Sequence, residues 1–206
     1  MSRSRRGSAG LMVMGEARLL TAAALVLLVS ASAISAYAQG SVSSPAQAVC
    51  STNGATGVSQ LHHDWIMTWD KQPGDAAFDF RAKFEKYYDW AGQDVHLYDD
   101  FDPQRRVARG PAEYGTFWAA PFTALKSARH GVINGPDAAS GSGDLAASTL
   151  EFVARLEAGD GKIIGIRTRS SLVWRCRPDG WKIVREHNSS LPISPAETDT
   201  LLRTSR

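Results

Sequence analysis

The sequence has 206 residues, of which 43% are hydrophobic and 21% are charged, and its formal net charge is +2. This length and composition are typical of one globular domain that buries a sizeable core. The charges nearly balance and no basic patch is interleaved with aromatic residues, which argues against a nucleic-acid partner.

Residues 1–38 have the layout of a secretory signal peptide. Four arginines come first, an apolar run covers residues 19–29, and the segment ends in Ala-Tyr-Ala at 36–38. We expect cleavage after Ala38, a periplasmic or secreted product and no remaining contact with the membrane. The alternative is an uncleaved membrane anchor, but the apolar run is shorter than the roughly 20 residues that a bilayer span needs.

The two cysteines are far apart in the chain. Cys50 lies in a polar lead-in at residues 39–55, and Cys176 lies in a late predicted strand. In an oxidising compartment an even number of cysteines permits a disulfide, here one that closes a loop of more than a hundred residues. The alternative is two separate buried thiols.

Three helices are expected in the first half. Apolar residues recur at helical spacing in 58–70, and a second helical pattern in 76–90 follows Asp75, a residue suited to capping. Pro111 opens a third helix, which Pro121 kinks or ends.

The strands follow a different pattern. Residues 94–100 alternate, so that Val95, Leu97 and Asp99 share one face. Residues 133–144 contain several glycines and a proline and are interpreted as a turn-rich link. Further strands are expected within 145–157, 163–177 and 181–190, and residues 194–206 as a loose polar tail. Helices followed by antiparallel strands indicate an α+β domain.

The last two strands form a predicted hairpin around Pro178-Asp179-Gly180. A three-residue connection pairs Arg177 with Trp181 and therefore places Ser171 opposite His187 and Arg169 opposite Ser189. One face of the hairpin then carries Arg169, Ser171 and His187 together. A tighter two-residue turn would instead place Leu172 opposite His187.

Two stretches carry a family resemblance, "LYDDFDPQRRVARGPAEYGTFW" and "LVWRCRPDGWKIVREHNSSLP". Together they resemble the SnoaL-like and ketosteroid-isomerase-like families of the nuclear transport factor two-like superfamily, and the ending is similar to the association domain of calcium/calmodulin-dependent protein kinase. The resemblance covers about residues 56–193. It implies a cone-shaped, curved antiparallel sheet wrapped around the three N-terminal helices, with an internal apolar pocket. Because family members often dimerise through the outer sheet face, it also implies a homodimer.

The resemblance suggests two catalytic residues. His187, with Ser189, resembles the histidine of the family's H-x-S ending, which implies a place at the pocket mouth; the alternative is a histidine that shapes the wall. Asp99 shares a face with apolar residues, so burial would raise its pKa as a general base requires. The alternative for Asp99 is an ion pair with Arg106 or Arg109.

Ligand-binding residues are also expected. Aromatic side chains on helices suit a flat apolar ligand, although plain packing is the alternative. Arg169 is either a ligand residue or part of an exposed or dimer-facing row of arginines. The expected set is Trp65, Trp69, Tyr88, Tyr114, Trp118, Arg169 and Ser171.

No metal and no cofactor are expected. His62 and His63 are adjacent on a helix and therefore point in different directions. The sequence thus predicts an exported domain that binds a small apolar or aromatic molecule, with acid–base chemistry of an isomerase, lyase or cyclase. The alternatives are a non-catalytic binding or dimeric assembly domain of the same fold, or a periplasmic immunity or partner protein.

Overall fold

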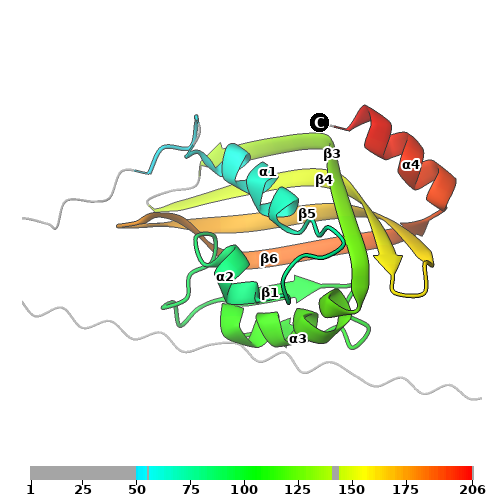
Figure 1. Ribbon diagram of the computed structural model, residues 1–206. Coiled ribbons are helices and arrows are strands. Elements are labelled where there is room, and N and C mark those ends of the chain that lie inside the picture. The colour runs from blue at the N-terminus through cyan, green and yellow to red at the C-terminus, as the bar shows by residue number, and fades with distance from the viewer. Residues whose placement is uncertain (1–49, 55, 141–143, 206) are drawn as a thin grey trace, which may run out of the picture. The chain divides into compact units, whose positions relative to one another are not determined.

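Four helices and six strands make up the described part of the chain, which comprises residues 50–54, 56–140 and 144–205 of a computed structural model (Figure 1). These residues belong to one compact unit. The predicted signal peptide and residues 39–49 and 55 of the predicted lead-in lie outside the described residues. None of the helices in the described ranges is long and apolar enough to cross a membrane.

The three predicted N-terminal helices are present as α1 (Val58–Thr68), α2 (Phe80–Phe84) and α3 (Pro111–Thr123). Helix α2 begins later than predicted because Asp79, not Asp75, caps it by accepting a hydrogen bond from the amide of Ala82 at 3.1 Å, and it ends earlier than predicted, at Phe84. Helix α3 continues two residues past Pro121, close enough to its end that little helical hydrogen bonding is lost.

The strands form one curved, unclosed sheet in the order β2-β1-β6-β5-β4-β3. Only the contact between β1 and β6 is parallel; the other neighbours are antiparallel. The α+β fold class predicted from the sequence is therefore confirmed. The strands are β1 (His96–Asp99), β2 (Val107–Ala108), β3 (Leu125–Ser140), β4 (Leu145–Ala158), β5 (Ile163–Arg177) and β6 (Gly180–Ile193).

The prediction of a turn-rich link at residues 133–144 is wrong for most of its length. Strand β3 runs to Ser140 and pairs with β4 up to that residue. The pairing with β4 shifts register on both sides of Asn134, and the Gly135–Pro136 peptide bond is cis. The shifted pairing lets a glycine and a proline remain within a strand. Because both residue types usually favour turns, the sequence pattern did not indicate this part of β3.

The β5–β6 hairpin has the predicted register at its open end and a different turn. Ser171 pairs with His187 and Arg169 pairs with Ser189, as predicted, but Arg177 pairs with Gly180 across a two-residue connection. A register shift between Val173 and Trp174 leaves Val184 as an extra residue in β6 and restores the expected pairing.

The tail predicted to be loose is the helix α4 (Pro195–Thr204), so that prediction is wrong. Ser194 caps the helix, accepting a hydrogen bond from the amide of Glu197 at 3.2 Å, and Leu202 is buried. The helix packs on β3, β4 and β5 (Figure 1). Gly131 and Gly165 allow this close approach, because a Cβ at either position would overlap a side chain of the α4 segment.

Helix α1 packs against β3 and β4 on the inner face of the sheet. Its His62 is fully buried and bonds Ser148 Oγ through Nδ1 at 2.9 Å and Ser170 Oγ through Nε2 at 3.0 Å. Burial lowers the pKa of His62 to about 3. A neutral imidazole accepts at one nitrogen and donates at the other, so the ring ties the helix to two strands without a charge.

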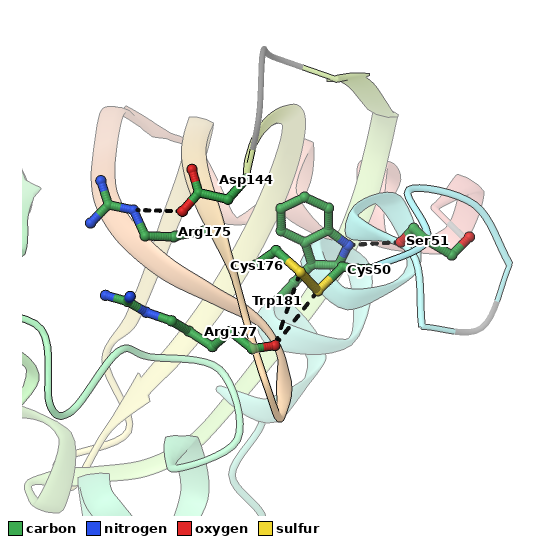
Figure 2. Close-up of a disulfide and its surroundings, with 7 residues drawn as sticks. All are labelled: Cys50, Ser51, Asp144, Arg175, Cys176, Arg177 and Trp181. Carbon is green, nitrogen blue, oxygen red and sulfur yellow. Dashed lines mark hydrogen bonds and ion pairs between the residues drawn. A yellow bond between two sulfur atoms is a disulfide. The ribbon is translucent and has the colours of Figure 1, made fainter. Parts of the chain in front are cut away.

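Of the two alternatives for the cysteines, the structure has the disulfide: Cys50 is bonded to Cys176, with the two Cα atoms 5.8 Å apart (Figure 2). Next to it, Trp181 Nε1 donates a hydrogen bond to the carbonyl oxygen of Ser51 at 2.7 Å. The start of the described chain is therefore fastened to the β5–β6 hairpin by a covalent bond and a hydrogen bond.

Candidate ligand cavity

A cavity of about 230 Å³ lies between the inner face of the sheet and the helices. An engineered apolar cavity of about 150 Å³ already holds benzene, so this volume suits a small aromatic-sized molecule. Helices α1 and α3 and strands β1, β3, β4, β5 and β6 contribute to its wall. The apolar lining consists of Trp65, Ile66, Trp69, Phe101, Trp118, Pro121, Phe122, Leu125, Phe152, Leu156, Ile164 and Ile166.

Five polar side chains interrupt this apolar wall. None of the described residues that line the cavity is a lysine or an arginine. The polar lining consists of Asp99, His130, Thr168, Asn188 and Ser190.

Asp99 lies at the end of β1 and lines the cavity, on the face that the sequence predicts. Its Oδ1 accepts a hydrogen bond from the Phe101 amide at 2.8 Å, and its Oδ2 accepts one from Asn188 Nδ2 at 3.0 Å. Burial outweighs these bonds and raises the pKa of Asp99 to about 6. A carboxyl group with that pKa can both accept and release a proton near neutral pH.

The alternative prediction, that Asp99 forms an ion pair with Arg106 or Arg109, is wrong. Arg106 instead binds Asp102 through Nε and Nη2, each at 2.9 Å. Arg109 contacts His96 Nε2 at 2.6 Å. The Asp99 carboxylate therefore accepts hydrogen bonds from neutral donors and has no ion pair with either arginine. Burial remains the largest influence on its pKa.

A second acid–base group, His130 on β3, was not predicted from the sequence. Its side chain is 7% exposed and lines the cavity. Asp70, directly after α1, accepts hydrogen bonds at Oδ1 from the His130 amide at 2.7 Å and from Nδ1 at 2.8 Å. In neutral His130 this contact places the proton on Nδ1, and Nε2 has no hydrogen-bond partner within the described ranges. The alternation of Ala128, His130 and Val132 was the available signal for an inward histidine.

Glu186 was not predicted as a site residue either, although its neighbour His187 was. It is 3% exposed and accepts hydrogen bonds from Tyr88 Oη and Tyr114 Oη, both at 2.7 Å, and from Asn188 Nδ2 at 2.8 Å. Burial raises the pKa of Glu186 to about 8 against these stabilising bonds. Asn188 therefore links a fully buried carboxyl group to Asp99 in the cavity wall.

The predicted role of His187 at the pocket mouth is not supported by its position. His187 is exposed on the outer face of the sheet, where its ring stacks on Tyr98 with centroids 5.0 Å apart. Ser171 and Arg169 share that outer face and are exposed as well. Val184 is an extra residue in β6, between the turn and the open end of the hairpin. It exchanges the two faces of the strand for the residues that follow, so that Glu186 and Asn188 point inward and His187 points outward.

The expected aromatic residues divide into two groups. Trp65, Trp69 and Trp118 line the cavity, and their role in ligand binding stays a prediction. Tyr88 and Tyr114 do not line it; they are 1% exposed and hold Glu186. Across the described residues, no three His, Cys, Asp or Glu side chains gather in a way that could hold a metal ion.

Three solved structures are similar to this chain over part of its length. A protein of the nuclear transport factor 2-like superfamily from Salmonella enterica aligns with a TM-score of 0.47 and 18% identity, over 55% of this chain and 78% of its own. A type 2 hexachlorocyclohexane dehydrochlorinase gives 0.49 and 12%, over 66% and 85%. The hub of an S. rosetta CaMKII gives 0.43 and 21%, over 53% and 81%.

In sequence, no curated protein matches this chain. The model of the SnoaL-like domain family matches residues 79–194, which is more than half of the chain. The match includes α2, α3 and all six strands. This chain therefore belongs to the SnoaL-like domain family.

Proposed function

We propose that this protein binds a small, largely apolar molecule in the cavity and moves a proton on it, with Asp99 as the base. The observation that carries the proposal is the position of Asp99, a carboxyl group in an otherwise apolar wall with a pKa of about 6. Carboxylates in such surroundings are the usual bases for removing a proton from carbon next to an activating group.

His130 supplies a second group for proton transfer. Its Nδ1 is bonded to Asp70, so its Nε2 is the atom that can accept or return a proton at the cavity wall. A base and a second proton carrier in one cavity suit isomerisation or elimination. In isomerisation a proton is removed from one atom and returned to another, and in elimination a proton is removed while a leaving group departs with the electron pair of its bond.

The test uses 5-nitrobenzisoxazole, whose ring opens when a base removes its ring C–H proton and the N–O bond breaks to give a coloured phenolate. The wild-type protein is expected to open this ring with saturable kinetics. Asp99→Asn should lower kcat/KM at least about a hundredfold, because the base is removed while the shape is kept.

Asp100→Asn is the matched control. Asp100 is the next carboxylate in the chain, bonds the amide of Ser190 at 2.8 Å and does not line the cavity. Its rate should stay within about twofold of the wild type. Saturable binding of the probe without Asp99-dependent turnover would instead favour a non-catalytic binding domain.

Export is part of the proposal. The disulfide between Cys50 and Cys176 supports it, because such bonds persist in oxidising compartments outside the cytosol. Expression of the full chain in a Gram-negative host should yield a periplasmic product whose mass places its N-terminus at Gln39. A product that keeps residues 1–38 would contradict cleavage.

The homodimer is also a proposal. Helix α4 covers part of the outer sheet face, which leaves the outer side of β1 and β6, with Tyr98 and His187, for a second copy. Light scattering should give twice the mass of one chain, and Tyr98→Glu should shift the protein to monomer because a buried unpaired charge opposes association. A wild-type protein that stays monomeric at high concentration contradicts this part of the proposal.

A further inference from the structure

A second pocket, of about 370 Å³, lies next to the cavity. Its lining comes from the chain between α1 and α2, from α2 itself and from the end of α3. Two lysines and two aspartates are part of this lining, namely Lys71, Lys83, Asp75 and Asp79. Among the described residues, Phe122 alone lines both the cavity and the second pocket.

The ring of Phe122 has neighbours in the lining of both spaces. Its centroid lies 5.5 Å from the nearer ring system of Trp69, which lines the cavity. It also lies 4.5 Å from the ring centroid of Phe78, which lines the second pocket. The Nζ atoms of Lys71 and Lys83, in the same pocket, are 5.9 and 5.8 Å from the ring centre. The ring of Phe122 therefore stands between the two spaces.

The neighbouring part of this wall is two side chains thick. There Trp69, which lines only the cavity, stacks on Phe78, which lines only the second pocket, with ring centroids 6.0 Å apart. At Phe122 a single side chain separates the two spaces. That side chain is buried, and Lys71 Nζ holds the end of α3 by donating hydrogen bonds to the carbonyl oxygens of Phe122 at 3.0 Å and Thr123 at 3.1 Å. Close packing of this kind resists displacement of the ring.

We infer that Phe122 is a specificity-determining residue, whose ring closes the cavity toward α2 and keeps the ligand to a compact body of about one ring. A ligand with a chain that extends in this direction would have to displace Phe122 from Trp69 and Phe78. With the ring removed, the same chain could enter the second pocket. The inference deepens the proposed function and rests on the use of this cavity as the binding site.

The test compares toluene with 5-phenyl-1-pentanol, which has the same ring and a five-carbon chain that ends in a hydroxyl group. Dissociation constants are measured by calorimetry for the wild type and for Phe122→Ala. Phe78→Ala is the matched control, because Phe78 lines only the second pocket and Phe122 still closes the cavity in this variant. The double variant Phe122→Ala with Ala82→Leu opens the wall and fills the second pocket, since Ala82 lines that pocket and not the cavity.

The quantity of interest is the chain preference, which is the dissociation constant of toluene divided by that of 5-phenyl-1-pentanol. Phe122→Ala should raise the chain preference at least about tenfold over the wild type, because each methylene that the second pocket buries is worth about a factor of four. Phe78→Ala should leave it within about twofold of the wild type. Ala82→Leu, added to Phe122→Ala, should remove most of the gain. If Phe122→Ala does not fold, Phe122→Val replaces it and should raise the chain preference at least about fourfold, the equivalent of one buried methylene.

The possible outcomes separate this inference from the proposed function. If toluene binds but the chain preference is the same with and without the Phe122 ring, or if Ala82→Leu leaves the gain intact, the inference is wrong and the apolar cavity still stands. If the chain preference behaves as expected while 5-nitrobenzisoxazole opening does not depend on Asp99, the inference holds and the proposed proton transfer is wrong. If the wild type binds neither probe, both the inference and the proposed binding site are wrong.

Discussion

At the scale of single residues, the buried Glu186 is a group whose protonation should couple strongly to folding. Its pKa in the folded protein is about 8, against 4.5 for an exposed glutamate. Between these pH values the folded state keeps a proton that the unfolded chain releases, so the contribution of Glu186 to stability is complete below pH 4.5 and is lost as the pH rises toward 8.

Glu186→Gln should remove this dependence, because glutamine can still accept hydrogen bonds but does not titrate. The wild-type free energy of unfolding should fall relative to the variant by up to about 1.4 kcal/mol per pH unit across that window. Urea denaturation at a series of pH values measures the difference. Glu85→Gln, an exposed change, is the control, and a wild type that runs parallel to Glu186→Gln would contradict the raised pKa of this buried carboxyl group.

His62 should produce the opposite dependence at lower pH. Its pKa is lowered from 6.5 to about 3, so below pH 6.5 the unfolded chain binds a proton that the folded state does not. Stability from this residue is present at neutral pH and is lost as the pH falls toward 3.

His62→Gln should flatten the acid side of the stability curve, because an amide can donate and accept in the same place without titrating. The variant and the wild type are compared by the same denaturation series, in which the wild type should lose up to about 1.4 kcal/mol more per pH unit. His63→Gln on the neighbouring, partly exposed residue should leave the slope unchanged. Equal slopes for wild type and His62→Gln would mean that the ring is not held neutral.

At the scale of elements, the docking of α4 on the sheet depends on a glycine. A Cβ at Gly165 would overlap Thr198 Oγ1 and lie 2.9 Å from the Ile193 carbonyl oxygen. Gly165→Ala should therefore lower stability by about 1–3 kcal/mol and expose α4 to proteolysis.

The double variant Gly165→Ala with Thr198→Ala should recover part of this loss, because the hydroxyl that overlaps is removed. Gly159→Ala is the control, since a Cβ there would make only an ordinary contact at 3.6 Å with the Ala124 carbonyl oxygen. Thermal unfolding and limited trypsin digestion provide the readouts. A Gly165→Ala protein as stable and as resistant as the control would contradict the observed docking.

At the scale of the whole molecule, the disulfide joins parts of the chain that are 126 residues apart. In the chain-entropy model, closing a loop of that length stabilises the folded state by about 4–5 kcal/mol, because the unfolded chain loses freedom. The double variant Cys50→Ala with Cys176→Ala should show a loss of that order in guanidinium denaturation. Its cavity should still bind toluene under native conditions, because neither cysteine lines the cavity. A variant as stable as the wild type would contradict the predicted contribution.

The sequence was sufficient to predict the fold class and the inward face of β1, and it permitted the disulfide without deciding between a bridge and two separate thiols. Strand β1 contains no irregularity, so Asp99 follows Leu97 to the inner face, as simple alternation requires. Alternation fails on β6, where one extra residue at Val184 turns His187 outward and Glu186 inward. A bulge of one residue leaves no clear mark in a strand that is rich in apolar and charged residues.

The missed His130 has a related cause. The glycines and proline that follow it in β3 favour turns, and only the irregular pairing with β4 keeps them in a strand. Its partner Asp70 is 60 residues away in sequence, so their contact depends on how α1 packs on the sheet. The position of His130 in the candidate site therefore depends on tertiary packing, which local sequence patterns do not encode.

The central claim is that Asp99 acts as a base inside an apolar cavity, and the pH dependence of 5-nitrobenzisoxazole opening tests it most directly. We expect kcat/KM to rise with pH and to level off above about 6, the pKa of Asp99, and we expect Asp99→Asn to abolish this rise. A rate that levels off near pH 4, the ordinary range of an exposed aspartate, or one that survives in Asp99→Asn, would contradict the claim.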